Sequence, residues 1–300
     1  MVRMLLSLLF FLSPVFPLVL EKVSEKVYMV RGGYGLPSEE NRGLISNAYA
    51  VLTREGWVVI DTLSTPELAR EFISELKKVR EAPILYVIAT HYHMDHWFGI
   101  APFKEEGAKF IAHRNLKRFY DEGFADEVLE SAIKTFGVFE GVRLVPPDLV
   151  VESRVRLRVG REIFEIIPMT PAHTNSDLVV RVGDLFFVGD LVSYGRIPFL
   201  GDRNVSTRRW LGVLRRLESM RPGKILMGHG EPADLRAIEW TASYITHVRE
   251  RVRLLKEKGF FVDEVKEALR DTPFRDAKMY EEFHMRNVYS VFNELDTELE

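Results

Sequence analysis

The sequence predicts an α/β fold in which two β-sheets pack face to face and helices cover the outside of both. Short apolar runs typical of strands alternate with longer stretches of helical periodicity. These elements form two similar sets, and each set has antiparallel-looking strands followed by a helix and a parallel-type strand. Of the 300 residues, 46% are hydrophobic, which is enough for a sizeable core.

The first set of elements occupies residues 21–140. Two strands are expected on either side of a turn at 54–56, in "SNAYAVLTREGWVVIDT". A helix should follow in "STPELAREFISELKKV", because either Ser64 or Thr65 can cap it and proline suits its first turn. Two short apolar strands, "PILYVIAT" and "AKFIAH", and a mixed helical stretch at 114–140 complete this set.

The second set begins after the two prolines 146–147, which interrupt the regular secondary structure. Its strands are "VRLRV", "REIFEIIPM", "DLVVRV" and "LFFVGD", followed by the helix "STRRWLGVLRRLESM" and the strand "KILMGHG". The rest of the chain has a helical pattern, and no linker separates independent domains. We therefore expect a catalytic domain at 21–233 and a helical C-terminal extension at 234–300 that packs on it.

The first twenty residues, "MVRMLLSLLFFLSPVFPLVL", have the layout of a secretory signal. One basic residue, Arg3, precedes an apolar run, two prolines follow, and the first acid is Glu21. The apolar run is short for a membrane span. No small-residue cleavage site precedes Glu21, so residues 1–20 are either a cleaved signal peptide or an N-terminal membrane anchor, and a buried first element is the alternative. The expected location is periplasmic or otherwise extracytoplasmic.

The composition excludes several classes of function. The net charge is −3, whereas nucleic-acid-binding proteins are usually basic, so no nucleic-acid partner is expected. The absence of cysteine excludes disulfides, thiolate metal ligands and cysteine nucleophiles. Glutamine is also absent while Glu, Lys and Arg are abundant, a pattern typical of proteins from thermophiles.

A histidine cluster in "ATHYHMDHWFGI" is the strongest sign of chemistry in the chain. Three of the eight histidines lie here, and all follow an apolar strand. On a loop that leaves a strand, imidazoles two residues apart can converge on one ion. Neutral imidazole and carboxylate are good zinc ligands. The predicted ligands from this cluster are His91, His93, Asp95 and His96.

Three further candidates, His173, Asp190 and His229, each follow an apolar strand. One cluster cannot supply ligands for two metals, so remote ligands are expected. A buried aspartate at position 190 would be costly without a compensating charge, and a metal is the simplest compensation. Each of the three alone has an ordinary structural explanation, but together with the cluster they favour a metal site.

This set of motifs resembles the metallo-β-lactamase superfamily over about residues 28–230. The pattern is His-x-His-x-Asp-His, a distant histidine, Gly-Asp at a strand end and then Gly-His-Gly. The resemblance implies a four-layer αββα sandwich with a site for two divalent metal ions at one edge of the sheets. Zinc is the expected metal, and manganese or iron also suit these ligands. The implied ligands are His91, His93 and His173 for the first metal, Asp95, His96 and His229 for the second, and Asp190 as the bridge.

The complete set of seven ligands resembles that of glyoxalase II and its relatives. Metallo-β-lactamases with a cysteine ligand do not fit, because this chain has no cysteine. The stretches "ISNAYAVLTREGWVVIDT", "HTNSDL" and "GRIPFLGDRNVSTRRWLGVLRRL" resemble exported zinc metallohydrolases associated with sulfur oxidation and with quinoprotein relay systems. This closer resemblance indicates the expected location of the protein more than the reaction that it catalyses.

The expected function is metal-dependent hydrolysis of a small thioester or ester-like substrate, including sulfur-containing compounds. A hydroxide bridging the two metals would attack the substrate, and Asp95, the predicted catalytic residue, would aim it. One alternative is β-lactam hydrolysis. An alternative of another class is a non-catalytic metal-binding or di-iron redox accessory protein. The expected partner is a small-molecule substrate, the N-terminal segment is a candidate membrane tether, and the sequence does not indicate an oligomeric state.

Several residues near these motifs have two interpretations. Asp61 either orients a ligand histidine or serves as a turn residue, whereas Thr90 is expected to end a strand and Asp177 to cap a local turn. His247 and His284 are expected at the surface. Four aromatic residues either form a substrate pocket or belong to the core, and two arginines are candidates for contact with an anionic substrate. These residues are Trp97, Phe98, Tyr194, Phe199, Arg196 and Arg203.

Overall fold

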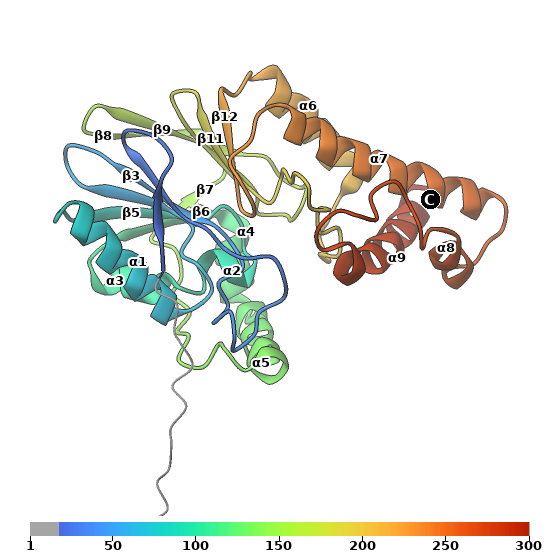
Figure 1. The fold of residues 1–300 in the computed structure, drawn as a ribbon, viewed down its shortest axis with the longest axis horizontal. Coiled ribbons are helices and arrows are strands. Elements are labelled where there is room, and N and C mark those ends of the chain that lie inside the picture. The colour runs from blue at the N-terminus through green and yellow to red at the C-terminus, as the bar shows by residue number, and fades with distance from the viewer. Residues whose placement is uncertain (1–17, 300) are drawn as a thin grey trace, which may run out of the picture.

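The computed structural model describes residues 18–299 and has the predicted four layers (Figure 1). Two β-sheets pack face to face, and a separate group of helices covers each of them. Residues 1–17, which hold most of the predicted signal or anchor segment, lie outside the described residues. Among the helices described, none has both the length and the apolar character needed to cross a bilayer.

The first sheet contains strands β1 to β7 in sequence order. Strands β1 to β4 pair antiparallel, which includes the predicted pair of strands around the turn at 54–56, and β4 to β7 pair parallel. The last strand has no clear sequence signal, because it has three residues and two of them are exposed. The strands are β1 (Leu20–Lys22), β2 (Val27–Val30), β3 (Ala48–Leu52), β4 (Trp57–Ile60), β5 (Ile84–Ile88), β6 (Lys109–His113) and β7 (Leu149–Val151).

The second sheet repeats this plan on a smaller scale, in the order β12-β11-β10-β9-β8. Strands β8 to β11 pair antiparallel, and β12 returns parallel to β11 after a helix. The two similar sets predicted from the sequence are therefore confirmed as two similar sheets. The strands are β8 (Val155–Val159), β9 (Glu162–Pro168), β10 (Leu178–Val182), β11 (Leu185–Gly189) and β12 (Lys224–Met227).

The helices beside the first sheet follow the predicted pattern, with one difference. Thr65 caps the first helix, where its side chain accepts a hydrogen bond from the amide of Leu68. The helical stretch predicted at 114–140 is two helices, because Gly123 adopts a left-handed conformation between them. The helices are α1 (Pro66–Val79), α2 (Met94–Trp97), α3 (Ile100–Glu105), α4 (Arg114–Asp121) and α5 (Phe124–Phe136).

The helices beside the second sheet include the C-terminal extension, which projects beyond the sandwich in Figure 1. Helix α7 packs on α6 and on α9. The prediction that His284 lies at the surface is wrong: it is buried, its Nδ1 lies 2.9 Å from the hydroxyl of Tyr244, and its ring stacks on Tyr280. These helices are α6 (Thr207–Ser219), α7 (Arg236–Glu257), α8 (Val262–Ala268) and α9 (Tyr280–Leu299).

Three apolar clusters lie between the four layers. The first fills the space between the first sheet and its helices and includes Phe72 and Phe103. The second lies between the sheets, where the rings of Tyr49 and Phe187 meet edge to face at 5.3 Å. The third lies beneath α6, α7 and α9 and includes Trp210. These cores fix the position of one sheet relative to the other, so that strand ends from both sheets meet at one edge.

Candidate metal centre

All seven predicted ligands come together where strands of both sheets end. The first cluster follows β5, His173 lies between β9 and β10, and Asp190 and His229 follow β11 and β12. They form two groups, and within each group the candidate ligand atoms lie within 4.8 Å of one another. We call these seven side chains the metal floor. The groups are His91, His93, His173 and Asp190, and then Asp95, His96 and His229.

Three atoms of the metal floor are buried without a hydrogen-bond partner in the described part of the chain: His91 Nε2, His96 Nε2 and Asp190 Oδ1. A buried polar atom without a partner is costly, so each needs a compensating group. All three belong to residue types that bind divalent metals. The donor set and its unpaired atoms therefore fit a pair of metal ions.

Each floor histidine has a hydrogen-bond partner at the ring nitrogen that would face away from the metal. Such contacts select the tautomer and fix the ring orientation. Two of the partners are carboxylates, two are backbone carbonyls and one is a hydroxyl. The pairs are His91 Nδ1 with Thr90 Oγ1 at 3.1 Å, His93 Nε2 with Asp202 Oδ2 at 3.0 Å, His96 Nδ1 with Asp61 Oδ2 at 2.8 Å, His173 Nδ1 with the Phe199 carbonyl at 3.1 Å, and His229 Nδ1 with the Ile45 carbonyl at 2.7 Å.

Asp61 fulfils both of its proposed roles. Its carboxylate faces His96 and accepts hydrogen bonds from the amide and the hydroxyl of Thr90, at 2.7 and 2.8 Å. Its backbone has a φ of 61°, so it also turns the chain in a left-handed conformation. The prediction that Thr90 only ends a strand is wrong, because its hydroxyl links Asp61 to His91. Asp177 caps a local turn as predicted, by accepting from the amide and hydroxyl of Thr174.

Asp202 has a similar orienting role that the sequence did not reveal. It lies in the long loop after β11 and reaches His93, which is 109 positions away. The hydroxyl of Tyr92 donates to it at 2.7 Å, and the amide of Asn204 donates to it at 2.7 Å. No motif surrounds Asp202, so no local sequence pattern marks it as an orienting residue.

Two glycines allow the strand ends to approach one another closely. A Cβ atom on Gly189, whose φ is 53°, would lie 2.6 Å from the hydroxyl of Thr90. A Cβ atom on Gly228 would lie 2.2 Å from Asp190 Oδ1 and 2.8 Å from His96 Cε1. Neither position has room for a larger residue, so both glycines are required by the packing of the metal floor.

The charges of the metal floor stabilise one another in the buried site. Burial lowers the pKa of His91 well below its ordinary value and that of His173 to about 3, so both rings are neutral at pH 7. Burial also acts to lower the pKa of His96, but the carboxylates of Asp95 and Asp190 outweigh it and raise this pKa well above the ordinary value. Burial opposes ionisation of these two carboxylates, and neighbouring imidazoles hold the pKa of each below its usual range.

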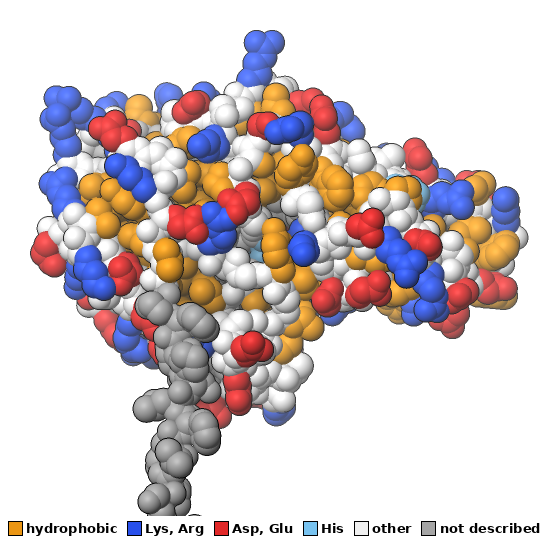
Figure 2. All heavy atoms as spheres, viewed as in Figure 1, with side chains coloured by type: hydrophobic (Ala, Val, Ile, Leu, Met, Phe, Trp, Pro, Cys, Tyr) orange, Lys and Arg blue, Asp and Glu red, His pale blue; other side chains and the backbone are white. Residues whose placement is uncertain are grey.

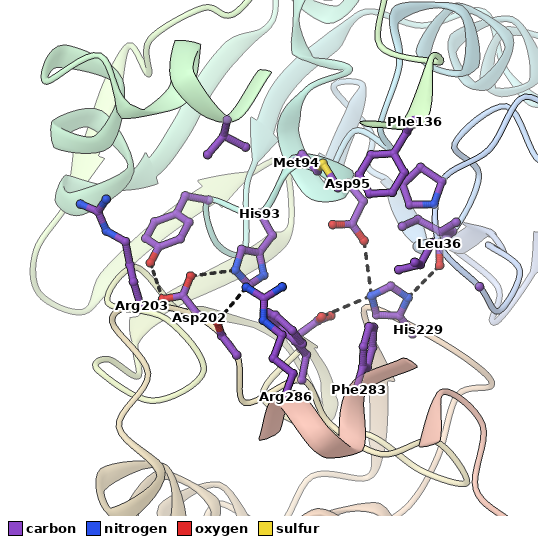
Figure 3. Close-up of a pocket in the computed structure, with 18 of the residues that line it drawn as sticks. Leu36, His93, Met94, Asp95, Phe136, Asp202, Arg203, His229, Phe283 and Arg286 are labelled. Carbon is purple, nitrogen blue, oxygen red and sulfur yellow. Dashed lines mark hydrogen bonds and ion pairs between the residues drawn. The ribbon is translucent and has the colours of Figure 1, made fainter. Parts of the chain in front are cut away.

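A pocket of about 500 Å³ opens above the metal floor. In Figure 3, the side chains of His93, Asp95 and His229 point into it, and Phe283 and Arg286 approach it from helix α9. The C-terminal extension therefore contributes directly to the pocket, a role that its helical pattern alone did not show.

The predicted aromatic lining is only partly confirmed. Phe199 lines the pocket. Trp97 is instead buried in the core beside the first sheet, and Phe98 is buried there too, which confirms the core interpretation that we favour for Phe98. Tyr194 is largely exposed and packs edge to face against Trp240, outside the pocket. Side chains next to a ligand in sequence point into different layers of the fold, and this is why adjacency in sequence predicts the pocket poorly.

Both arginines predicted to contact substrate, Arg196 and Arg203, line the pocket, and Arg286 joins them from the extension. On the face seen in Figure 2, acidic and basic side chains are interspersed, with hydrophobic side chains between them along the middle. The three arginines share the pocket lining with four acidic residues, Asp95, Glu127, Asp190 and Asp202.

Comparison with known proteins agrees with this geometry. Residues 41–229 match the family model described as the metallo-beta-lactamase superfamily. The chain is 24% identical over 216 residues to a metallo-beta-lactamase type 2 of Elizabethkingia meningoseptica, which covers 69% of this chain and 77% of that protein. It is 33% identical over 269 residues to a linear primary-alkylsulfatase of a Pseudomonas species, which covers 73% of this chain and 49% of that protein.

Solved structures show the same fold. A metallo-beta-lactamase from Pontibacter korlensis has a TM-score of 0.61 and 20% identity, and the match covers 76% of this chain and 99% of that one. A stereoselective inverting sec-alkylsulfatase from a Pseudomonas species has a TM-score of 0.73 and 19% identity, covering 92% of this chain and 50% of that one. The chain thus spans about half the length of the alkylsulfatases it matches. Because the family model matches more than half of its residues, this protein belongs to the metallo-β-lactamase superfamily.

Proposed function

We propose that the protein is a metal-dependent hydrolase whose two metal ions are held by the metal floor. Three buried atoms that lack a hydrogen-bond partner among the described residues, His91 Nε2, His96 Nε2 and Asp190 Oδ1, carry this proposal. The five histidines support it further, because a hydrogen bond fixes the orientation of each ring, as is usual for histidines that bind a metal. Membership of a superfamily of metal-dependent hydrolases agrees with it.

The geometry supports the predicted assignment of Asp190 as the bridge. Its Oδ1 lies 3.4 Å from His96 Nε2, and its Oδ2 lies 3.2 Å from His229 Nε2 and 3.8 Å from His173 Nε2. One carboxylate therefore faces both ligand groups. When bound, two divalent cations, with zinc expected, supply a more acidic water and a Lewis acid for a substrate oxygen.

Asp95 is the residue we propose to position the attacking water. Its carboxylate lines the pocket, and Oδ2 lies 3.4 Å from both His96 Nε2 and His229 Nε2. Those imidazoles keep the pKa of Asp95 low, so its carboxylate is ionised and can accept a hydrogen bond at neutral pH. The buried position of the floor keeps this acceptor in one orientation.

We propose that the protein cleaves an ester-like bond. A thioester is the first candidate, because the set of seven ligands resembles that of glyoxalase II. A sulfate ester is the second candidate, because a linear primary-alkylsulfatase is 33% identical over the matched region. The structural match to the sec-alkylsulfatase covers 92% of this chain, which is more than residues 1–233 make up. The match therefore includes part of the helical extension. A β-lactam is the third candidate and rests on the match to a metallo-beta-lactamase type 2.

A hydrolysis panel on protein reconstituted with zinc, manganese or iron tests the proposal. The panel contains a thioester, a carboxylic ester, an alkyl sulfate and nitrocefin. Turnover that requires two metals per chain and is lost in Asp95→Asn is the expected result. Protein that holds two metals but cleaves none of the four bonds would refute the hydrolase proposal, and iron content without hydrolysis would favour a redox accessory protein.

A further inference from the structure

We infer that the substrate is an amphiphilic anion, with its negative group bound by Arg196 beside the metal floor and its apolar body held by the pocket wall. The inference rests on the proposed function in placing the reacting bond at the metal floor. It adds the chemical class of the molecule that carries this bond.

Arg196 is the first observation. The residue is only 7% exposed and lines the pocket, and within residues 18–299 its side chain makes no hydrogen bond or ion pair. Its guanidinium lies over the ring of Phe283, 5.3 Å from the centroid. A buried cation that has no counter-ion is costly. Burial lowers the pKa of Arg196, and the carboxylates of Asp190 and Asp95 act against this.

In the metal-loaded protein those two carboxylates do not neutralise Arg196, because their negative charge is offset by the proposed metal ions. Two divalent cations carry more charge than the two floor carboxylates, so the guanidinium then adds to a positive site. A ligand with a negative group next to the reacting bond restores the balance and can accept paired hydrogen bonds from the guanidinium.

Arg203 and Arg286 add two further guanidinium groups to the pocket lining, which also includes the exposed carboxylate of Glu127. The guanidinium of Arg203 lies 4.0 Å from the centroid of the Phe124 ring, and that of Arg286 lies 5.0 Å from the centroid of Phe199. Arg286 also donates to the Gly201 carbonyl at 3.3 Å. Both side chains are exposed and are therefore screened by solvent, so we assign the main anion contact to buried Arg196.

The apolar wall is the second observation. It is formed by side chains from the loop before β3 and from helices α2, α4, α5 and α9, and Leu36 and Val128 stay exposed at the mouth. The pocket volume of about 500 Å³ is in the range of sites for molecules larger than a simple inorganic anion. A wall of this composition stabilises an alkyl or aryl body rather than a polar one. Its main residues are Leu36, Met94, Phe119, Phe124, Phe136 and Phe283.

Calorimetric titration with eight-carbon probes tests the inference in both metal-loaded and metal-free protein. The anions are octyl sulfate and octanoate, used below their micelle concentrations, and the neutral partners are octanol and octanamide. We expect each anion, or one of the two, to bind at least about tenfold more tightly than its neutral partner. A preference confined to one anion identifies the head group as sulfate or carboxylate. A butyl chain should weaken binding.

Arg196→Gln should remove most of the preference for the anion, whereas Arg196→Lys should keep part of it. The melting temperature of Arg196→Gln should be unchanged or higher, because a buried unpaired charge is removed; a purely structural arginine would give a lower value. Arg209→Gln, an exposed arginine on α6, is the matched control.

The outcomes separate this inference from the proposed function. If Arg196→Gln binds octyl sulfate and octanoate as the unaltered protein does, the inference is overturned even where ester hydrolysis continues. If anion binding depends on Arg196 but no ester is cleaved, the binding inference is supported and the proposed function fails. Equal binding of anionic and neutral probes would overturn the inference directly.

Discussion

The metal floor and the pocket wall differ in how the fold positions their residues. Floor residues lie at or just beyond the ends of buried strands, and each histidine has a hydrogen-bond partner at the ring nitrogen that would face away from the metal. Wall residues come from loops and helices that approach the floor from the outside, in the parts of a fold that vary most easily. The difference suggests that reaction chemistry depends on the rigid sheets and substrate choice depends on what surrounds them.

The loop after β11 joins these two regions. It contributes Asp202, which orients the floor residue His93, and it contributes Phe199 to the wall. Asn287 of α9 holds this loop by accepting from the Leu200 amide at 2.7 Å and donating to the Pro198 carbonyl at 2.8 Å. The C-terminal extension therefore packs on the sandwich and also supports the loop that carries both kinds of residue.

The largest expected effect comes from breaking the floor. His91→Ala removes a proposed ligand and should lower hydrolytic activity by at least about two orders of magnitude, because the metal site loses a donor. Elemental analysis should show less than two metals per chain. His247→Ala, a half-buried histidine on α7, is the control and should keep both metal and activity. A fully active His91→Ala protein would contradict the ligand assignment.

Asp61→Asn should have the next largest effect, because the amide cannot accept from His96 with the strength of a carboxylate. Loss of an orienting partner typically weakens metal affinity by about 10- to 100-fold. Competition with a chromogenic chelator measures this change. Asp184→Asn, at the turn between β10 and β11, is a control remote from the site. Unchanged metal affinity in Asp61→Asn would mean that the contact of Asp61 with His96 does not strengthen metal binding.

Breaking the wall should leave the metals in place. Phe283→Ala removes an apolar surface and the ring beneath Arg196, so KM for a long-chain substrate should rise by about tenfold while kcat changes less. Metal content should stay at two per chain. Phe261→Ala, a largely exposed residue of the same extension, is the matched control. Loss of metal in Phe283→Ala would remove the proposed separation between wall and floor.

The smallest effect concerns a histidine outside both regions. Burial lowers the pKa of His113 to about 4, and its Nδ1 accepts from the amide of Asn115 at the start of α4. The unfolded chain binds a proton near the ordinary pKa of 6.5, so the stability that neutral His113 contributes is complete above that pH and is lost as the pH falls toward 4.

His113→Asn keeps a capping oxygen and removes the titration. Denaturant unfolding should show that the variant loses about 1 kcal/mol less stability than the unaltered protein between pH 7 and pH 4, allowing for partial solvent screening. Identical pH profiles for the two proteins would contradict the effect. Neither metal content nor KM should change, because His113 contacts neither floor nor wall.

The sequence predicted the floor better than the wall for physical reasons. The seven floor residues follow strong apolar strands, and a strand end places a side chain at a known edge of a sheet. Asp202, Phe283 and Arg286 were missed because their positions depend on how a long loop and a helix dock, which no local pattern records. His284 was misplaced for the same reason: a helix pattern does not show which face another helix will cover.

Anomalous X-ray diffraction from crystals of the metal-loaded protein is the most direct test of the central claim. The account predicts two peaks of anomalous density, one among His91, His93 and His173 and one among Asp95, His96 and His229, with Asp190 between them. A single peak, or metal bound elsewhere while these side chains keep only one another as partners, would contradict it.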